Sequence, residues 1–168
     1  TPWRGRFIYP PAVAALDGQR LPGHPEWRAT LPADTAALQR NALQMSNCTV
    51  GYRASIERGE RFIVVLDNEQ APPDGSQRRL NVAIIATRGS PLHVGEINSI
   101  GNAGGVPRWL RPTMNRWLDD LRLSNGGDDA LPTYAPSRPP SRDARCVRRR
   151  RASSRSANRP SKPTGTRR

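Results

Sequence analysis

The arginines near the carboxyl end of the chain are the residues whose chemistry is easiest to read. Residues 132–168 hold twelve Lys and Arg side chains against one acid, Asp143, so this segment carries +11 of the formal charge of +13. One guanidinium group can bind two phosphate oxygens at once, and this binding releases the counterions condensed on a polyanion. We therefore expect nucleic acid as the partner, with RNA favoured over DNA. The expected phosphate-binding side chains are Arg142, Arg145, Arg148, Arg149, Arg150, Arg151, Arg155, Arg159, Lys162, Arg167 and Arg168.

Trp109 is the aromatic residue best placed to add a stacking contact, because Arg108 and Arg111 flank it. An indole beside guanidinium groups can stack on an unpaired base while the cations bind the neighbouring phosphates. These three residues join the candidate nucleic-acid site. The competing interpretation is a tryptophan packed in the core, which we expect for Trp117 on an apolar helical stripe.

Two short patterns indicate sites of covalent modification. Asn47-Cys48-Thr49 matches the N-glycosylation sequon, although the same residues suit a plain turn between two elements. Ser153 follows four consecutive arginines, a pattern typical of basophilic kinase sites, where an added phosphate would weaken polyanion binding. A disulfide between Cys48 and Cys146 is a further alternative for a secreted chain.

No residue constellation in the sequence predicts catalysis. The two histidines, His24 and His93, lack the spacing to a nucleophile or an acid that a catalytic triad needs, and they are too few for a three-histidine zinc site. The glycines at 101, 104 and 105 match neither dinucleotide-binding nor phosphate-loop motifs and indicate a turn. We expect a protein that is not an enzyme and that needs no cofactor or metal.

One stretch of about 45 residues carries a pattern of its own: a strand that ends at Asp67, a Pro-Asp-Gly turn at 73–75, a Leu-x-Val-Ala strand at 80–83, and Ala-Gly-Gly-Val-Pro at 103–107. It resembles the amino-terminal hairpin and oxyanion loop of secreted α/β-hydrolases of the tripeptidyl aminopeptidase type. Val106 departs from the Gly-Gly-Pro-Gly loop of that family. The resemblance implies a divergent or truncated hydrolase-like domain, since the family's serine, acid and histidine would fall where this chain has its arginine-rich segment.

Hydrophobic periodicity predicts an α+β fold. It is expected to be a small antiparallel sheet of about three to four strands, connected as a meander and packed by two helices. The strands 61–67 and 78–87 run continuously apolar, which indicates that both sheet faces are covered. Asp34 and Thr35 offer cap oxygens to the first helix. The expected elements are a helix over 35–46, strands over 48–56, 61–67 and 78–87, a short strand over 92–97 and a helix over 113–124.

The expected organisation is an extended arm rich in aromatic residues and Pro over 1–33, and a compact domain over 34–126. A linker over 127–141 and a disordered arginine-rich tail over 142–168 would follow. The compact portion is close to neutral, because residues 1–131 hold fifteen Arg against thirteen acids. No apolar run is long enough for a membrane span.

These observations favour a non-enzymatic RNA-binding component of a ribosome-like ribonucleoprotein. We expect it to contact neighbouring proteins of the assembly and to be located inside the cell or in an organelle. The alternative is a secreted or viral protein–protein interaction module whose basic tail is dispensable. The sequence leaves the organism, the oligomeric state and any base specificity open.

Overall fold

The structure is a computed structural model that describes residues 5–75 and 77–125, so the linker and tail expected over 127–168 lie outside the described residues. Five antiparallel strands form one sheet in the order β1-β2-β3-β4-β5. The expected meander is therefore confirmed, with more strands than expected. The strands are β1 Arg20–Leu21, β2 His24–Thr30, β3 Arg61–Asn68, β4 Arg79–Ile85 and β5 His93–Ser99; the helices are α1 Pro11–Ala14, α2 Thr35–Met45, α3 Arg53–Glu57 and α4 Leu110–Ser124, with short 3-10 turns η1 Thr49–Tyr52 and η2 Ile100–Asn102.

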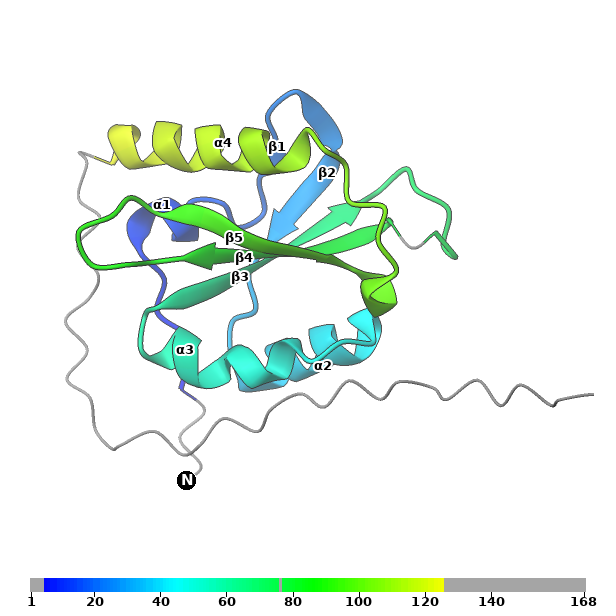
Figure 1. Ribbon diagram of the computed structural model, residues 1–168, viewed down its shortest axis with the longest axis horizontal. Helices are drawn as coiled ribbons and strands as arrows, with labels where there is room; N and C mark the ends of the chain where they lie inside the picture. Colours follow the sequence, from blue (N-terminus) through cyan, green and yellow to red (C-terminus); the bar gives the residue numbers. More distant parts are fainter. Residues whose placement is uncertain (1–4, 76, 126–168) are drawn as a thin grey trace, which may run out of the picture.

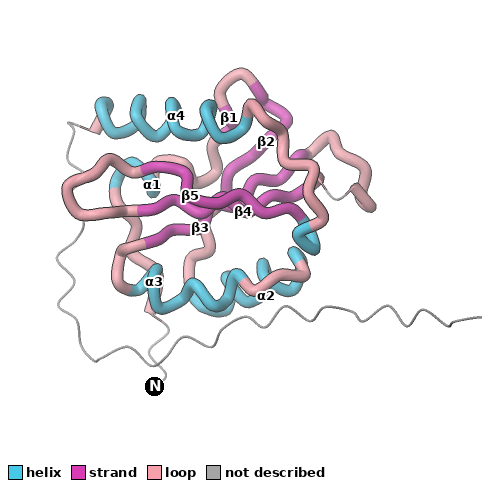
Figure 2. The backbone as a smooth tube through the Cα atoms, viewed as in Figure 1, coloured by secondary structure: helices cyan, strands magenta, loops and turns pink. Residues whose placement is uncertain are grey.

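Helices lie on both faces of the sheet, α4 on one side and α2 with α3 on the other (Figure 1). Alternate residues of β3 supply the two interfaces: Phe62 and Val64 belong to the core that includes residues of α1 and α4, while Ile63 and Val65 pack with Leu38 of α2. A strand that is apolar on both faces requires this three-layer arrangement. The layers can be followed in Figure 2, where the strands run between the helices.

Helix α4 supplies the apolar stripe that the sequence predicts. Leu110, Met114, Trp117 and Leu118 are all buried, at the spacing of one helical face. The helix begins three residues before the expected start at Thr113. Its third residue is Pro112, and this is compatible with the first turn, where backbone N–H groups have no partner within the helix.

Helix α2 closely matches the expected helix over 35–46. The Asp34 carboxylate caps it, with 2.8 Å between Oδ1 and the amide nitrogen of Ala37. The helix ends where Ser46 adopts a left-handed conformation at φ 49°. The cap and the left-handed end explain why the periodic pattern stops where it does.

The strand expected over residues 48–56 is wrong, because this segment forms η1 and α3. Thr49 and Ile56 are its buried residues, and they lie seven positions apart, a spacing that matches two helical turns. Val50 is exposed, although a β-branched residue of a central strand would be buried. Strand propensity depends on packing against neighbouring strands, and this segment instead packs with α2 on one face of the sheet.

The extended arm expected over residues 1–33 is also wrong from Pro11 to Thr30, which form α1, β1 and β2. Pro11 occupies the first position of α1, where its fixed φ suits a helix start. Gly23, at φ 77°, turns the chain between β1 and β2. The many prolines thus mark the ends of short elements and do not prevent them from forming. The buried apolar residues of this segment are Ala12, Val13, Leu16, Leu21, Trp27 and Ala29.

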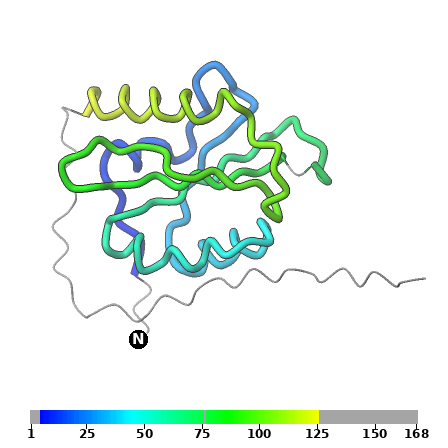
Figure 3. The backbone as a smooth tube through the Cα atoms, viewed as in Figure 1, coloured from blue at the N-terminus to red at the C-terminus, as the bar shows by residue number. Residues whose placement is uncertain are grey.

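The first and last described helices meet on one side of the sheet. Helix α1 contacts α4, and both contribute buried residues to the same core (Figure 3). The β1–β2 hairpin and the start of α4 are also close together, because the rings of His24 and Trp109 stack there.

Candidate nucleic-acid interface

His24 and Trp109 form a parallel ring stack where the β1–β2 hairpin meets α4. Their ring centroids lie 3.6 Å apart and their planes differ by 6°. His24 is the first residue of β2, and Trp109 immediately precedes α4. Trp109 is partly buried and packs against the core to which α4 contributes. The imidazole of His24 covers one face of its indole ring. Trp109 is therefore in part a core residue, and it is also partly exposed to solvent.

The side chain of Arg20 lies close to the His24 end of the β1–β2 hairpin. One guanidinium nitrogen is 2.5 Å from the carbonyl oxygen of Pro25, the residue after His24. The other is 2.8 Å from Glu69, whose second oxygen lies 4.0 Å from Arg28. Arg20 and Arg28 have half-exposed side chains, so two cations share one carboxylate at the surface.

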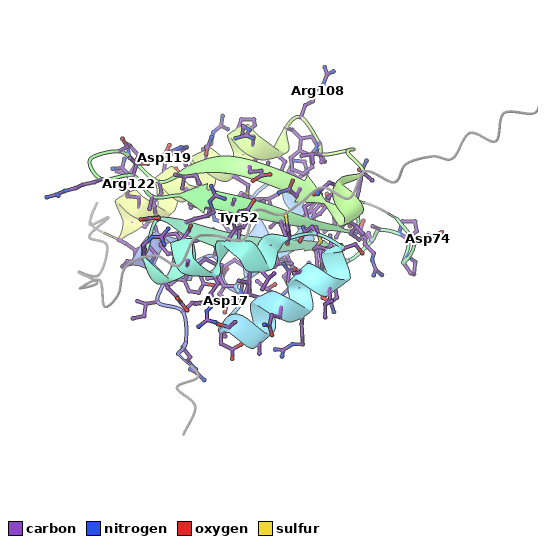
Figure 4. All side chains as sticks on the ribbon, turned by 60° about the horizontal axis from the view of Figure 1, so that its bottom comes forward. Asp17, Tyr52, Asp74, Arg108, Asp119 and Arg122 are labelled. Atoms are coloured by element: carbon purple, nitrogen blue, oxygen red, sulfur yellow. The ribbon has the colours of Figure 1, made fainter. Side chains whose placement is uncertain are left out.

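Arg108 and Arg111, which flank Trp109, have different environments. Arg108 is exposed and points away from the body in Figure 4. Arg111 instead lies against the outer edge of β5, with Nη1 at 2.5 Å from the carbonyl oxygen of Val94 and 3.2 Å from that of Gly95. Asn115 completes this contact by accepting the Val94 N–H at 2.8 Å. Both residues are exposed, but Arg111 uses Nη1 to bind β5, whereas no described side chain forms an ion pair with Arg108.

The remaining sequence-predicted residues of the nucleic-acid site fall outside residues 5–125. Their assignment stays a prediction, as do the Ser153 phosphorylation site and the pairing of Cys48 with Cys146. The residues concerned are Arg142, Arg145, Arg148, Arg149, Arg150, Arg151, Arg155, Arg159, Lys162, Arg167 and Arg168.

The side chain of Asn47 makes the turn contacts that the sequence suggested as the alternative to glycosylation. Its Oδ1 accepts hydrogen bonds from the backbone N–H of Thr49, at 3.1 Å, and from the Thr49 hydroxyl. Thr49 is itself buried and accepts from Asn81 Nδ2 at 2.9 Å. The sequon therefore forms part of a packed junction between α2 and η1, and its glycosylation stays a prediction.

Tyr52 of η1 is linked to the sheet through its hydroxyl. The hydroxyl donates to Glu96 Oε2 at 2.8 Å, and the Arg61 guanidinium lies 4.3 Å from the ring centroid. Burial, followed by the hydrogen bond to Glu96, raises the pKa of Tyr52 to about 12 from the usual 10.0. Burial raises the pKa of Tyr9 further still, and its hydroxyl donates to the carbonyl oxygen of Pro32 at 2.6 Å. Both tyrosines are uncharged structural contacts near neutral pH.

Metal-binding or membrane-spanning features do not occur in the described part of the chain. Within it, no three His, Cys, Asp or Glu side chains are grouped as metal ligands would be. None of its helices combines the length and the apolar character that crossing a bilayer requires. His93 is exposed, and its Nδ1 lies 3.2 Å from the carbonyl oxygen of Pro91.

Comparisons of this chain with protein-family models, with curated proteins and with solved structures found no match. The candidate site consequently rests on charge, geometry and burial. Sequence reasoning missed His24, because the residue lies far from Trp109 in the sequence and has no motif around it. A histidine beside Gly23 at a hairpin turn was the one available signal.

Proposed function

We propose that this protein binds RNA through its arginine-rich carboxyl-terminal segment and acts as a structural component of a ribonucleoprotein assembly. The folded body positions the segment and contributes a small surface around Trp109. In this proposal the protein neutralises phosphate groups and catalyses no reaction.

The unequal distribution of charge is the observation that carries the proposal. Residues 132–168 hold +11 of the +13, while residues 1–131 are nearly balanced. Within the body, carboxylates already occupy several arginines, as in the contact of Arg79 with Asp67 at 2.5 Å and that of Arg53 with Glu57 at 2.7 Å. A polyanion is therefore attracted mainly to the carboxyl-terminal segment. Association should depend steeply on salt.

RNA is favoured over DNA because the arginines lie in a segment with repeated Pro and Ser and no helical pattern that would fit a major groove. An arginine-rich segment of this composition can follow the irregular backbone of folded RNA. Shape and charge, and not base edges, would then set the affinity.

The test compares two full-length variants that lose the same charge. One replaces Arg148, Arg149, Arg150 and Arg151 by Gln; its control replaces four exposed body arginines, Arg6, Arg40, Arg78 and Arg88. The first variant should bind a single-stranded RNA more weakly and should lower the slope of log affinity against log salt by up to about 3, at roughly 0.7 per phosphate contact. The control should change the slope by less than about 1 on the same scale. Equal changes in both, or binding by the parent chain that does not vary with salt, would contradict the proposal.

A further inference from the structure

The His24–Trp109 stack combines a fixed aromatic ring with an accessible surface. The parallel indole at 3.6 Å covers one face of the imidazole, yet 31% of the His24 side chain is exposed to solvent. The indole is in turn held by the core beneath α4. A ring that is already oriented in the fold loses little conformational entropy when a planar ligand stacks on it.

From this geometry we infer that the outward side of His24, supported by Trp109, is a stacking platform for an unpaired nucleobase. The inference rests on the proposed function and assigns a second contact to it: the carboxyl-terminal arginines bind phosphates, and the platform binds a base of the same RNA strand. The base adds on the imidazole side of the pair, because the indole packs against the core and the imidazole is the partly exposed ring that covers it.

Two arginines, Arg20 and Arg108, lie near the residues of the platform. Arg20 reaches the carbonyl of Pro25, next to His24, and Arg108 precedes Trp109 with its side chain exposed. No described side chain forms an ion pair with Arg108. A phosphate that flanks a stacked base would meet Arg108, since Arg20 already pairs with Glu69 at 2.8 Å. Glu26, 3.6 Å from His24 Nδ1, disfavours phosphate at that ring edge.

The chemistry of the platform selects single strands without selecting a base. Every nucleobase has a π face, so stacking is tolerant of sequence. Bases inside a duplex already stack on their neighbours and are not available to a protein ring. The platform therefore favours unpaired RNA over a duplex of equal charge.

Full-length His24→Leu and His24→Tyr variants test this inference, because both keep a bulky side chain on the indole and only one keeps an aromatic ring. The probes are a labelled single-stranded oligoribonucleotide, the same strand with abasic positions, and the corresponding duplex. His93→Ala is the control for loss of a histidine, since His93 is exposed on β5 and is not part of the stack.

The His24→Leu variant should bind the intact single strand about fivefold or more weakly, as expected for the loss of one stacked base. Its affinities for the abasic strand and for the duplex should stay within about twofold, and His24→Tyr should retain the parent affinities. Equal weakening for all three probes, or no weakening in His24→Leu, would overturn the platform and leave salt-dependent RNA binding intact. Failure of the parent chain to bind any probe would instead overturn the proposed function.

Discussion

Asn41 donates a hydrogen bond to Asn81 across the interface between α2 and the sheet, with 3.1 Å between Nδ2 and Oδ1. Asn81 passes the contact on, because its own Nδ2 donates to the Thr49 hydroxyl at 2.9 Å. All three side chains are at most 5% exposed. A buried amide without a partner is destabilising, so this contact specifies one position of α2 and η1 over β4.

Removal of the Asn81 amide should destabilise the fold through the partners that it leaves behind. In Asn81→Ala, the donor of Asn41 loses its acceptor and the Thr49 hydroxyl loses a donor, so the free energy of unfolding should fall by about 1 to 3 kcal/mol. Urea denaturation measures this change. Asn98→Ala is the control, since Asn98 faces Asn81 on β5 but is only half-buried, and should change the free energy by less than about 0.5 kcal/mol. Similar losses in the two variants would show that the hydrogen-bonded chain has no special role.

Two leucines of α2 provide a matched test of the core. Leu38 is fully buried against the sheet, whereas Leu43 on the same helix is 80% exposed. Leu38→Ala should lower the free energy of unfolding by about 2 to 5 kcal/mol, because it removes buried methyl groups and leaves a cavity. Leu43→Ala should change it by at most about 0.5 kcal/mol. If Leu38→Ala and Leu43→Ala lowered the free energy of unfolding by similar amounts, measured by thermal and urea denaturation, the placement of α2 would be contradicted.

The arginines on either side of Trp109 should differ in their effect on stability. Arg111→Ala removes hydrogen bonds to the carbonyls of Val94 and Gly95 and should cost about 1 to 2 kcal/mol of unfolding free energy. Arg108→Ala should leave the unfolding free energy almost unchanged and weaken RNA binding by the loss of one phosphate contact. The reverse pattern, with Arg108 needed for folding, would refute the contact between α4 and β5.

Alkaline pH should destabilise the body through Tyr52. Its pKa is raised to about 12 in the folded chain, while an unfolded tyrosine ionises near 10.0. The unfolded state therefore releases the proton first, and the stabilising contribution, complete below pH 10, is lost as the pH rises towards 12. Tyr52→Phe should reduce this pH dependence, as measured by urea denaturation across that range. An unchanged pH profile in the variant would show that the hydroxyl does not titrate in this way.

The sequence was sufficient to predict the elements whose side chains repeat regularly and whose ends carry clear signals. The two long helices and the β3–β4 hairpin follow from apolar periodicity, the Asp34 cap and the continuous apolar strands. The extra strands and the helix α3 depend instead on contacts between distant segments. Residues 20–30 read as interrupted because Pro25 lies within β2, although the residues of β2 that pair with β3 begin only at Trp27, beyond the proline.

The candidate site, too, could be predicted from the sequence only in part. Charge counting along the chain predicts the carboxyl-terminal arginines as phosphate-binding residues, and this stays a prediction because they lie outside the described residues. It did not distinguish Arg108 from Arg111, whose different environments arise only when α4 packs along β5. The partner of Trp109 was equally hidden, since pairing with His24 depends on the hairpin meeting the start of α4.

The packing of α1 against α4 has a consequence for synthesis on the ribosome. Val13 and Leu16 belong to the same core as Met114 and Leu118, which lie on α4 close to the end of the described residues. A nascent chain must therefore emerge almost to the end of α4 before this core can be completed, and until then part of its apolar surface stays accessible to chaperones. The basic segment follows α4 closely in the sequence, so it leaves the exit tunnel at about the time when the body can first complete its fold.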